Sequence, residues 1–328
     1  MMGASEADII QDGSEESPDL SEYHLAYSTY NKADDPLGLT VGDICRPREK
    51  NNDLYGWGGN SVLATATLAR WQGVVDETVA SFEDLQNKIN RNETADLPDD
   101  VMYDKDSYHL QNVEYIYMTK ANRNQIKQKL MEYGAAECSM YAPETSSDNQ
   151  MYGNTGKSNF TAYYCDDTSK TTNHSVLIVG WDDNYSASNF NSKCRPSSDG
   201  AWLIRNSWGD CNSMGGYFWI SYEDAMLQAE ENEEAEAAFF DVEKADNYDN
   251  NYQYDGGIPF AFSKSFLRGA NVFEAKADEK MQAVSFYTQE ANVNYEVSIY
   301  ESPDSENPMS CKLVSSLSGT IAERGYHT

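Results

Sequence analysis

Basic side chains are scarce in this sequence. The 328 residues contain 24 Lys and Arg against 54 Asp and Glu, which gives a formal net charge of −30. Binding of nucleic acid normally needs a basic patch, and an anionic membrane surface attracts the same charges. The composition therefore argues against both of these partners and is typical of a strongly solvated surface.

Three further patterns are missing. No apolar run reaches the length of a membrane span, and the N-terminus lacks the basic and apolar regions of a signal peptide. None of the six cysteines forms a C-x-x-C pair, so no zinc or redox motif is expected. Cys194 and Cys211 flank one hairpin-like segment, where a disulfide could form, but free buried thiols fit at least as well.

The order of the predicted elements favours an α+β fold, with helices first and an antiparallel sheet after them. Helices are predicted at 1–11, 20–30, 58–73 and 122–134. Strands are predicted at 113–118, 135–142, 160–165, 175–181, 200–209 and 216–223. Loops are predicted at 31–56, 76–106 and 143–159. The second helix has Asp19 or Ser21 as its cap, and Gly73 stops the third.

An acidic stretch, Glu223–Asp246, separates two parts of the chain. It carries ten Asp or Glu and one Lys, and such a run is typical of a solvated helix or linker. We therefore place a domain boundary between residues 246 and 247. The short alternating runs "MQAVSFYTQ", "NYEVSIYE" and "CKLVSSLSG" that follow are typical of a β-sandwich. Residues 247–328 are too few for a whole sandwich, so an incomplete one is expected.

A histidine, His174, stands at the start of the apolar run "SVLIVGW". A single histidine there is more often a satisfied structural residue than a catalytic one. The segment "NSWG" at 206–209 changes that balance, because pairing of the two strands would place Asn206 beside His174. An amide oxygen that accepts one ring N–H leaves the other ring nitrogen able to take a proton from a nucleophile. Asn206 alone would be a turn residue and Trp208 alone a core residue, but the combination favours a catalytic pair covered by Trp208.

These segments resemble the papain-like (C1 family) cysteine peptidases of the bacterial type that carries a C-terminal lectin-like domain. "NHSVLIVGWDD" and "GAWLIRNSWG" resemble the family's His and Asn segments, "LSEYHLAY" its L-S-E-x-x-L segment and "GWGGN" its glycine pair. "NYDNNYQYDGG" and "ANVFEA" resemble the start of the lectin-like module. The likeness covers nearly the whole chain. It implies a two-lobed papain-like domain over 1–246 and part of a lectin-like β-sandwich over 247–328.

The resemblance also implies a role for each matching residue. His174 would be the general base and later the general acid, Asn206 would orient it, and Trp208 would shield the pair. The implied reaction is thiol-dependent endopeptidase chemistry by a thiolate–imidazolium pair, which needs no metal or organic cofactor.

Substrate contacts are implied at two further places. Gly58 and Gly59 would pair with the backbone of an extended substrate, since a residue without Cβ permits close approach. Asn173 lies where the family uses a backbone carbonyl to hold the peptide. The implied partner is a protein or peptide substrate, with a cell-surface glycan as candidate ligand of the C-terminal module. The implied location is secreted or at the cell surface.

The nucleophile of this family is missing from the sequence. In the family it stands in a Q-G-x-C-W type segment at the start of the helix before L-S-E, which here is the helix at 1–11. Glu6 matches the glutamate typical of that helix, which puts the cysteine a handful of residues before Met1. None of the six cysteines heads a helix, where the dipole would lower a thiol pKa. We therefore expect a fragment of an active secreted enzyme, cut at both ends and unable to cleave peptides by itself. The alternative is an inactive pseudo-peptidase that acts as a carbohydrate- or surface-binding protein.

Overall fold

A computed structural model gives the fold of most of the chain. It describes residues 1–31, 37, 58–103, 107–143, 145–153, 159–228, 235–254, 268–301, 307 and 310–328. Nearly all of the loop predicted at 31–56, including Cys45, lies outside the described residues. Two compact units are formed, Met1–Leu20 with Tyr115–Val242 (unit 1) and Ser21–Glu114 with Glu243–Thr328 (unit 2). The domain boundary after residue 246 stays a prediction.

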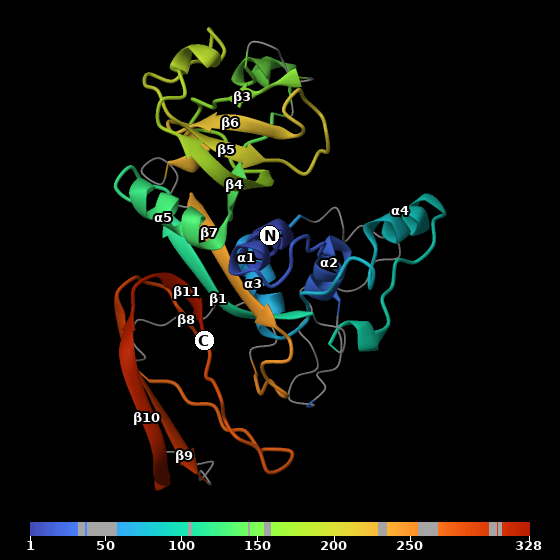
Figure 1. Ribbon diagram of the computed structural model, residues 1–328, viewed down its shortest axis with the longest axis vertical. Helices are drawn as coiled ribbons and strands as arrows, with labels where there is room; N and C mark the ends of the chain where they lie inside the picture. Colours follow the sequence, from blue (N-terminus) through green and yellow to red (C-terminus); the bar gives the residue numbers. More distant parts are fainter. Residues whose placement is uncertain are drawn as a thin grey trace. The chain divides into compact units, whose positions relative to one another are not determined.

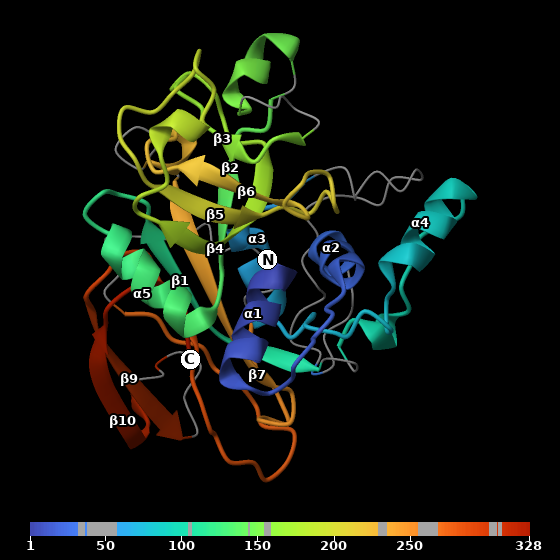
Figure 2. The same ribbon diagram turned by 45° about the horizontal axis from the view of Figure 1, so that its top comes forward.

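Unit 1 is built on a sheet with the strand order β3-β6-β5-β4-β2-β7. The strands are β2 (Ala136–Met140), β3 (Ala162–Tyr163), β4 (His174–Asp182), β5 (Ala201–Arg205), β6 (Tyr217–Ser221) and β7 (Glu236–Lys244). Neighbours in this order pair antiparallel, apart from the parallel pair β3 and β6. Both views show β4, β5 and β6 side by side (Figures 1 and 2). The predicted antiparallel sheet is therefore confirmed for the strands that carry the candidate site.

Two helices belong to unit 1, α1 (Met2–Asp12) and α5 (Arg123–Tyr133). They pack against each other, and Gly134, where α5 ends, lies against α1. A Cβ at Gly134 would lie 3.0 Å from the carbonyl oxygen of Ala7, and its φ of +82° is one that favours glycine. Both helices and the glycine stop of α5 agree with the prediction.

The core of unit 1 lies among the inward-facing side chains of its sheet. Its members include Cys138, Met140, Val176, Ile178, Trp202, Ile204, Phe218, Ile220, Ala237 and Phe239. Each of these side chains is nearly or fully buried. Burial of this much apolar surface is the main force that holds the sheet together.

Strand β7 corrects the prediction for the acidic stretch. A solvated helix or linker was expected over Glu223–Asp246, but Glu236–Lys244 is a strand whose Ala237, Phe239 and Phe240 are fully buried. The run "AAFFDV" is long enough to form a core strand. The acidic residues on either side dominate the charge of the segment, so its apolar character is easily missed. Just before it, Ala225–Leu227 forms a buried 3-10 turn (η6) capped by Asp224.

The described part of unit 2 contains three α-helices, α2 (Glu22–Tyr30), α3 (Ser61–Ala69) and α4 (Phe82–Asn90). Of the two predicted caps for α2, Ser21 is the one used, and its side chain accepts a hydrogen bond from the backbone of His24 at 2.9 Å. Helix α3 ends four residues before Gly73, because Trp71 takes a left-handed φ of 61°.

Helix α4 was missed by the sequence analysis, which expected a loop over 76–106. Leu85 is the one residue of α4 that is buried, although Phe82, Leu85 and Ile89 recur at helical spacing. An ion pair at 3.0 Å joins Asp84 and Lys88, one turn apart, and two acidic residues stand in the first turn. The segment was expected to be a loop because it is polar on average, and this hides the short apolar pattern that a helix would show.

The C-terminal region of unit 2 is built of strands, as predicted. Its strands are β8 (Phe286–Thr288), β9 (Val293–Glu301), β10 (Lys312–Ile321) and β11 (Arg324–His327). β9 and β10 form an antiparallel ribbon that both views show as a pair (Figures 1 and 2). β8 pairs with β11, which lies beside β1 (Tyr108–Tyr117). No helix in the described part of the chain is long and apolar enough to cross a membrane.

Asp8 is a buried carboxylic acid in α1. It is 7% exposed, and its Oδ2 accepts a hydrogen bond from the backbone N–H of Val242 at 2.9 Å. Burial raises its pKa from 3.8 to about 7; the bond from Val242 opposes the rise, and Asp241, Asp12 and Glu132 add to it. The folded protein therefore holds a proton on Asp8 over a pH range in which the unfolded chain has lost it.

Because of this proton, Asp8 should make the free energy of unfolding fall as the pH rises. The contribution of Asp8 is fully present below about pH 4 and is lost as the pH rises through about 7, since the folded pKa is the higher one. Asp8→Asn removes the titration, so its free energy of unfolding should change less between about pH 4 and pH 8 than that of the wild type. Urea unfolding at several pH values measures this. Asp224, whose pKa burial also raises to about 7, titrates in both proteins and cancels in the comparison. Identical pH profiles would contradict the assignment.

Candidate active site

Strands β4 and β5 bring His174 and Asn206 together. His174 is the first residue of β4, and Asn206 directly follows the last residue of β5. Nε2 of His174 lies 2.8 Å from Oδ1 of Asn206. Because an amide oxygen can only accept, Nε2 carries the proton and Nδ1 is the basic nitrogen of the neutral ring. Nδ1 has no hydrogen-bond partner among the described residues.

Asn206 is held rigidly in this place. It is 3% exposed, and its Oδ1 also accepts from the backbone N–H of Ser207 at 2.8 Å. Its own backbone N–H donates to the carbonyl of Gly216 at 3.1 Å. A buried amide whose oxygen accepts two hydrogen bonds has few alternative rotamers, so the orientation of His174 is fixed in turn.

Trp208 covers one face of the histidine. The two rings stack with centroids 4.8 Å apart and an angle of 26° between their planes. Trp208 is itself 42% exposed, so it stands between the imidazole and solvent. The shielding role predicted for Trp208 stays a prediction.

The start of α1 lies against the strands that carry His174. A Cβ at Gly3 would come within 2.6 Å of the Leu177 side chain in β4. Ser175 donates a hydrogen bond to the buried carboxyl of Glu137 in β2 at 2.6 Å. Burial raises the pKa of Glu137, whereas the hydrogen bond from Ser175 lowers it. The contact between Gly3 and Leu177 places the start of α1 beside β4, the strand that begins at His174.

Asn173 is fastened to the neighbouring loop. Its Oδ1 accepts from the backbone N–H of Ala142 at 2.6 Å, and its Nδ2 donates to the carbonyl of Ala142 at 3.0 Å. Its backbone N–H donates to Met140 at 3.1 Å. The peptide unit next to His174 is thereby held in one conformation. The role predicted for the Asn173 carbonyl stays a prediction.

Comparison with known protein families shows which family the chain belongs to. Residues 44–237, more than half of the chain, match the model of the papain family cysteine proteases. The chain belongs to this family. Residues 251–328 of this papain-family protease match the model of the lectin-like domain.

Two solved structures of one bacterial relative are similar along almost the whole chain. The first is of a variant of the clostridial cysteine protease Cwp84 after propeptide cleavage, with 28% identity, a TM-score of 0.72, and coverage of 99% of this chain and 72% of that one. The second contains the cysteine protease and lectin-like domains of Cwp84, a surface layer associated protein of Clostridium difficile. It has 27% identity, a TM-score of 0.71, and coverage of 99% and 64%. No curated protein sequence matches the protease. The fold is therefore a mixed α/β papain-like domain followed by a small lectin-like β region.

Gly58 and Gly59 lie in unit 2 of the protease, just before α3. Both are exposed, and a Cβ at either would meet no atom within 4 Å. Gly58 has a φ of +75°, and its carbonyl accepts from the Tyr30 hydroxyl at 2.8 Å. Their predicted pairing with a substrate backbone at His174 stays a prediction, since His174 belongs to the other unit.

The cysteines of the described part of the protease are free thiols, so no disulfide joins Cys194 and Cys211. The free-thiol alternative is therefore confirmed and the disulfide is wrong. Burial raises the pKa of Cys138, and it raises those of Cys165 and Cys194 to about 12. A protonated thiol is a poor nucleophile, so these three side chains are structural. In addition, no group of three or more His, Cys, Asp or Glu in the described ranges could hold a metal ion.

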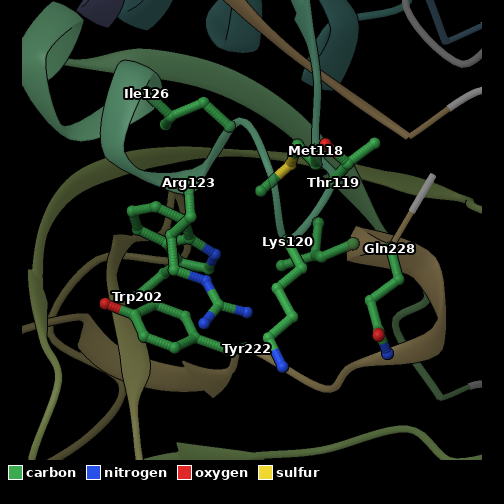
Figure 3. A pocket seen from close by; sticks show the side chains of 9 residues that line it. Met118, Thr119, Lys120, Arg123, Ile126, Trp202, Tyr222 and Gln228 are labelled. Carbon is green, nitrogen blue, oxygen red and sulfur yellow. The ribbon is translucent and has the colours of Figure 1, made fainter. Parts of the chain in front are cut away.

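A small pocket lies elsewhere in unit 1, at the start of α5 (Figure 3). It is lined by Met118, Thr119, Lys120, Arg123, Ile126, Trp202, Tyr222, Leu227 and Gln228. The Arg123 guanidinium lies 4.0 Å from the centre of the Tyr222 ring, a cation–π contact. None of the predicted site residues lines this pocket.

The loop after Asn206 contains residues that the sequence analysis missed. Gly209 and Gly216 have φ values of +64° and +83°. A Cβ at Gly216 would lie 2.5 Å from the carbonyl oxygen of Gly209 and also collide with Arg205, whereas a Cβ at Gly209 would meet nothing within 4 Å. The adjacent glycines before β6 were the available signal, since two glycines in a row indicate a tight turn.

These two glycines give a matched pair of variants. Gly209→Ala should lower the free energy of unfolding by about 1–2 kcal/mol, the cost of the left-handed conformation alone. Gly216→Ala should cost about 1–3 kcal/mol more, because the loop must open to admit the methyl group. Urea unfolding of both variants tests this. Equal losses would mean that the close approach of Gly216 to Gly209 contributes nothing.

Proposed function

We propose that this chain is the main part of a cysteine-type endopeptidase that hydrolyses proteins or peptides by thiolate–imidazolium acyl transfer. The observation that carries the proposal is the 2.8 Å hydrogen bond from Nε2 of His174 to Oδ1 of Asn206. It leaves Nδ1 as the one ring nitrogen that can exchange a proton with a nucleophile. The thiol belongs at the N-terminal end of α1, ahead of Met1.

His174 would serve twice in each turnover. With the thiolate formed, the imidazolium donates its Nδ1 proton to the leaving amine as the tetrahedral intermediate collapses to a thioester. The neutral ring then takes a proton from water, which attacks the thioester, and the thiolate leaves. Asn206 holds the ring in register through both steps, and Trp208 keeps water from the hydrogen bond.

The place proposed for the thiol fits its chemistry. The first turn of α1 contacts Leu177 in β4, the strand that begins at His174. A thiol at the start of a helix is stabilised as thiolate by the helix dipole, and a protonated histidine beside it acts in the same direction. Both effects favour the ion pair that the reaction requires.

Substrate binding is proposed for Gly58, Gly59 and Asn173. Gly58 and Gly59 expose their backbone on unit 2 without side chains in the way, which suits pairing with an extended peptide. The double hydrogen bond between Asn173 and Ala142 fixes the carbonyl proposed to hold the peptide beside the scissile bond.

A second candidate function is binding of a cell-surface glycan by the C-terminal region. The match of residues 251–328 to the lectin-like model supports it. Secretion or attachment at the cell surface is proposed on the same ground, together with the similarity to Cwp84, a surface layer associated protein. If the peptidase part were inactive, this binding would be the remaining function.

The test of the peptidase proposal is hydrolysis of an unfolded protein by the product of the whole reading frame. Activity should be lost on treatment with iodoacetamide and kept in the presence of a metal chelator, because the nucleophile is a thiol. Activity that survives alkylation would overturn the proposal. No activity in any redox state would favour the binding function.

A further inference from the structure

The loop between β5 and β6 carries two members of the candidate site. Asn206 stands at its start, and Trp208 follows two residues later. The loop ends at Gly216, whose carbonyl accepts the backbone N–H of Asn206 at 3.1 Å. Loops are usually the most mobile parts of a fold, so something must hold this one for the site to stay in register.

One side chain, that of Asn212, makes four hydrogen bonds within and beyond this loop. Its Oδ1 accepts from the backbone N–H groups of Met214 at 2.9 Å and Gly216 at 3.1 Å. Its Nδ2 donates to the carbonyls of Phe160 at 2.9 Å and Tyr217 at 2.8 Å. Its full capacity of two donors and two acceptor sites is used.

These bonds connect the loop to the body of unit 1. Phe160 is 2% exposed and packs in the core, so the bond to its carbonyl ties the tip of the loop to a rigid point. The backbone N–H of Ser213 adds a second tie, to Oδ1 of Asn159 at 2.9 Å. Two further bonds of the Asn212 side chain go to Gly216 and Tyr217, where the loop enters β6.

Gly216 passes this restraint to the site. It holds the backbone of Asn206 directly through its carbonyl, and it packs against Gly209, the residue next to Trp208. The path from Asn212 to the imidazole is therefore short, through Gly216 to Asn206 and from Asn206 to His174.

We propose that Asn212 is a positioning residue of the candidate active site, which holds Asn206 and Trp208 against His174 through Gly216. Its catalytic consequence rests on the proposed peptidase function, but the positioning itself does not. Only Asn has two donors and two acceptor sites on so short a side chain. Asp loses the donors and Ala loses all four bonds, so each substitution removes a defined part of the restraint.

The proposal is tested on the 328-residue chain by NMR of its histidine side chains. The sequence contains four histidines, so His174 is assigned by loss of its signals in His174→Ala. In the wild type the His174 Nε2–H should exchange slowly with water and the ring should be almost wholly the Nε2–H tautomer. In Asn212→Ala we expect exchange about tenfold faster and a mixture of tautomers, the effect of releasing one hydrogen bond.

Asn191→Ala is the matched control. Asn191 also joins loop backbones in unit 1, donating to Tyr152 at 3.1 Å and accepting from Lys193 at 3.0 Å, but none of its hydrogen bonds reaches the loop 206–216. Its removal should leave the His174 signals unchanged. Asn212→Asp, which keeps the two acceptor bonds, should exchange at a rate between wild type and Asn212→Ala, and it serves alone if the alanine variant does not fold.

Unchanged exchange and tautomer in the Asn212 variants would overturn the proposal, as would an equal change in Asn191→Ala. None of these signals depends on a thiol or on peptide hydrolysis. The positioning role can therefore stand even if the protein proves not to be a peptidase, and it can fail even if the protein is one.

Discussion

Replacing His174 by alanine is expected to lower kcat/KM for peptide hydrolysis by about 10⁴-fold or more in the product of the whole reading frame. The imidazole would be lost both as the partner of the thiolate and as the acid that protonates the leaving amine. No other ring in the described part of the chain is placed to take over, because His174 is the histidine bonded to Asn206. The measurement is steady-state hydrolysis of one fluorogenic peptide by both proteins.

Two further variants show whether the loss of activity arises from the His174–Asn206 pair. Asn206→Ala should cost less, about 10- to 100-fold, because the base remains and only its orienting hydrogen bond is gone. His327→Ala is the control, since His327 lies in the C-terminal region and contacts Thr288 at 3.0 Å. Wild-type hydrolysis by His174→Ala would exclude the proposed mechanism.

Phe239→Ala is expected to lower the free energy of unfolding by about 3–5 kcal/mol. The ring is fully buried in the core of unit 1, where it contacts Tyr133 with centroids 5.7 Å apart. Truncation loses the transfer free energy of the ring and leaves a cavity that the surrounding strands cannot fill. Urea unfolding followed by tryptophan fluorescence measures the loss.

Phe82→Ala is the matched control for this variant. Phe82 is 47% exposed at the start of α4, so its truncation should change stability by about 0.5 kcal/mol or less. Similar losses for the two phenylalanines would mean that β7 is not part of the core, as the charge count in the sequence had suggested.

Much of the candidate site could be predicted because its residues stand in distinctive local segments. His174 opens a long apolar strand and Asn206 closes another, so antiparallel pairing alone brings the two together. Gly58 and Gly59 were predicted from the family resemblance alone. Their position relative to His174 depends on the arrangement of two units, which a local sequence pattern does not encode. The position of the proposed thiol relative to His174 likewise depends on where the N-terminal end of α1 lies.

The elements that escaped prediction share a physical cause. β7 is a short apolar strand surrounded by acidic residues, and α4 is a short helix in a largely polar segment, so the average composition around each element hides its apolar residues. Asn212 escaped because nothing in its immediate sequence reveals four hydrogen bonds, two of which reach Phe160 and Tyr217. Such a role appears only when the loop has closed on the core.

The most direct test of the thiolate–imidazolium pair is the rate of thiol alkylation by iodoacetamide as a function of pH, with the modified residue identified by mass spectrometry. In the product of the whole reading frame, the account predicts a cysteine ahead of Met1 that reacts rapidly down to about pH 4, as a histidine-paired thiolate does. In His174→Ala, the onset of its reactivity should shift toward the free-thiol pKa of about 8.5. A cysteine that behaves as a free thiol in the wild type, or that reacts the same way with and without His174, would contradict it.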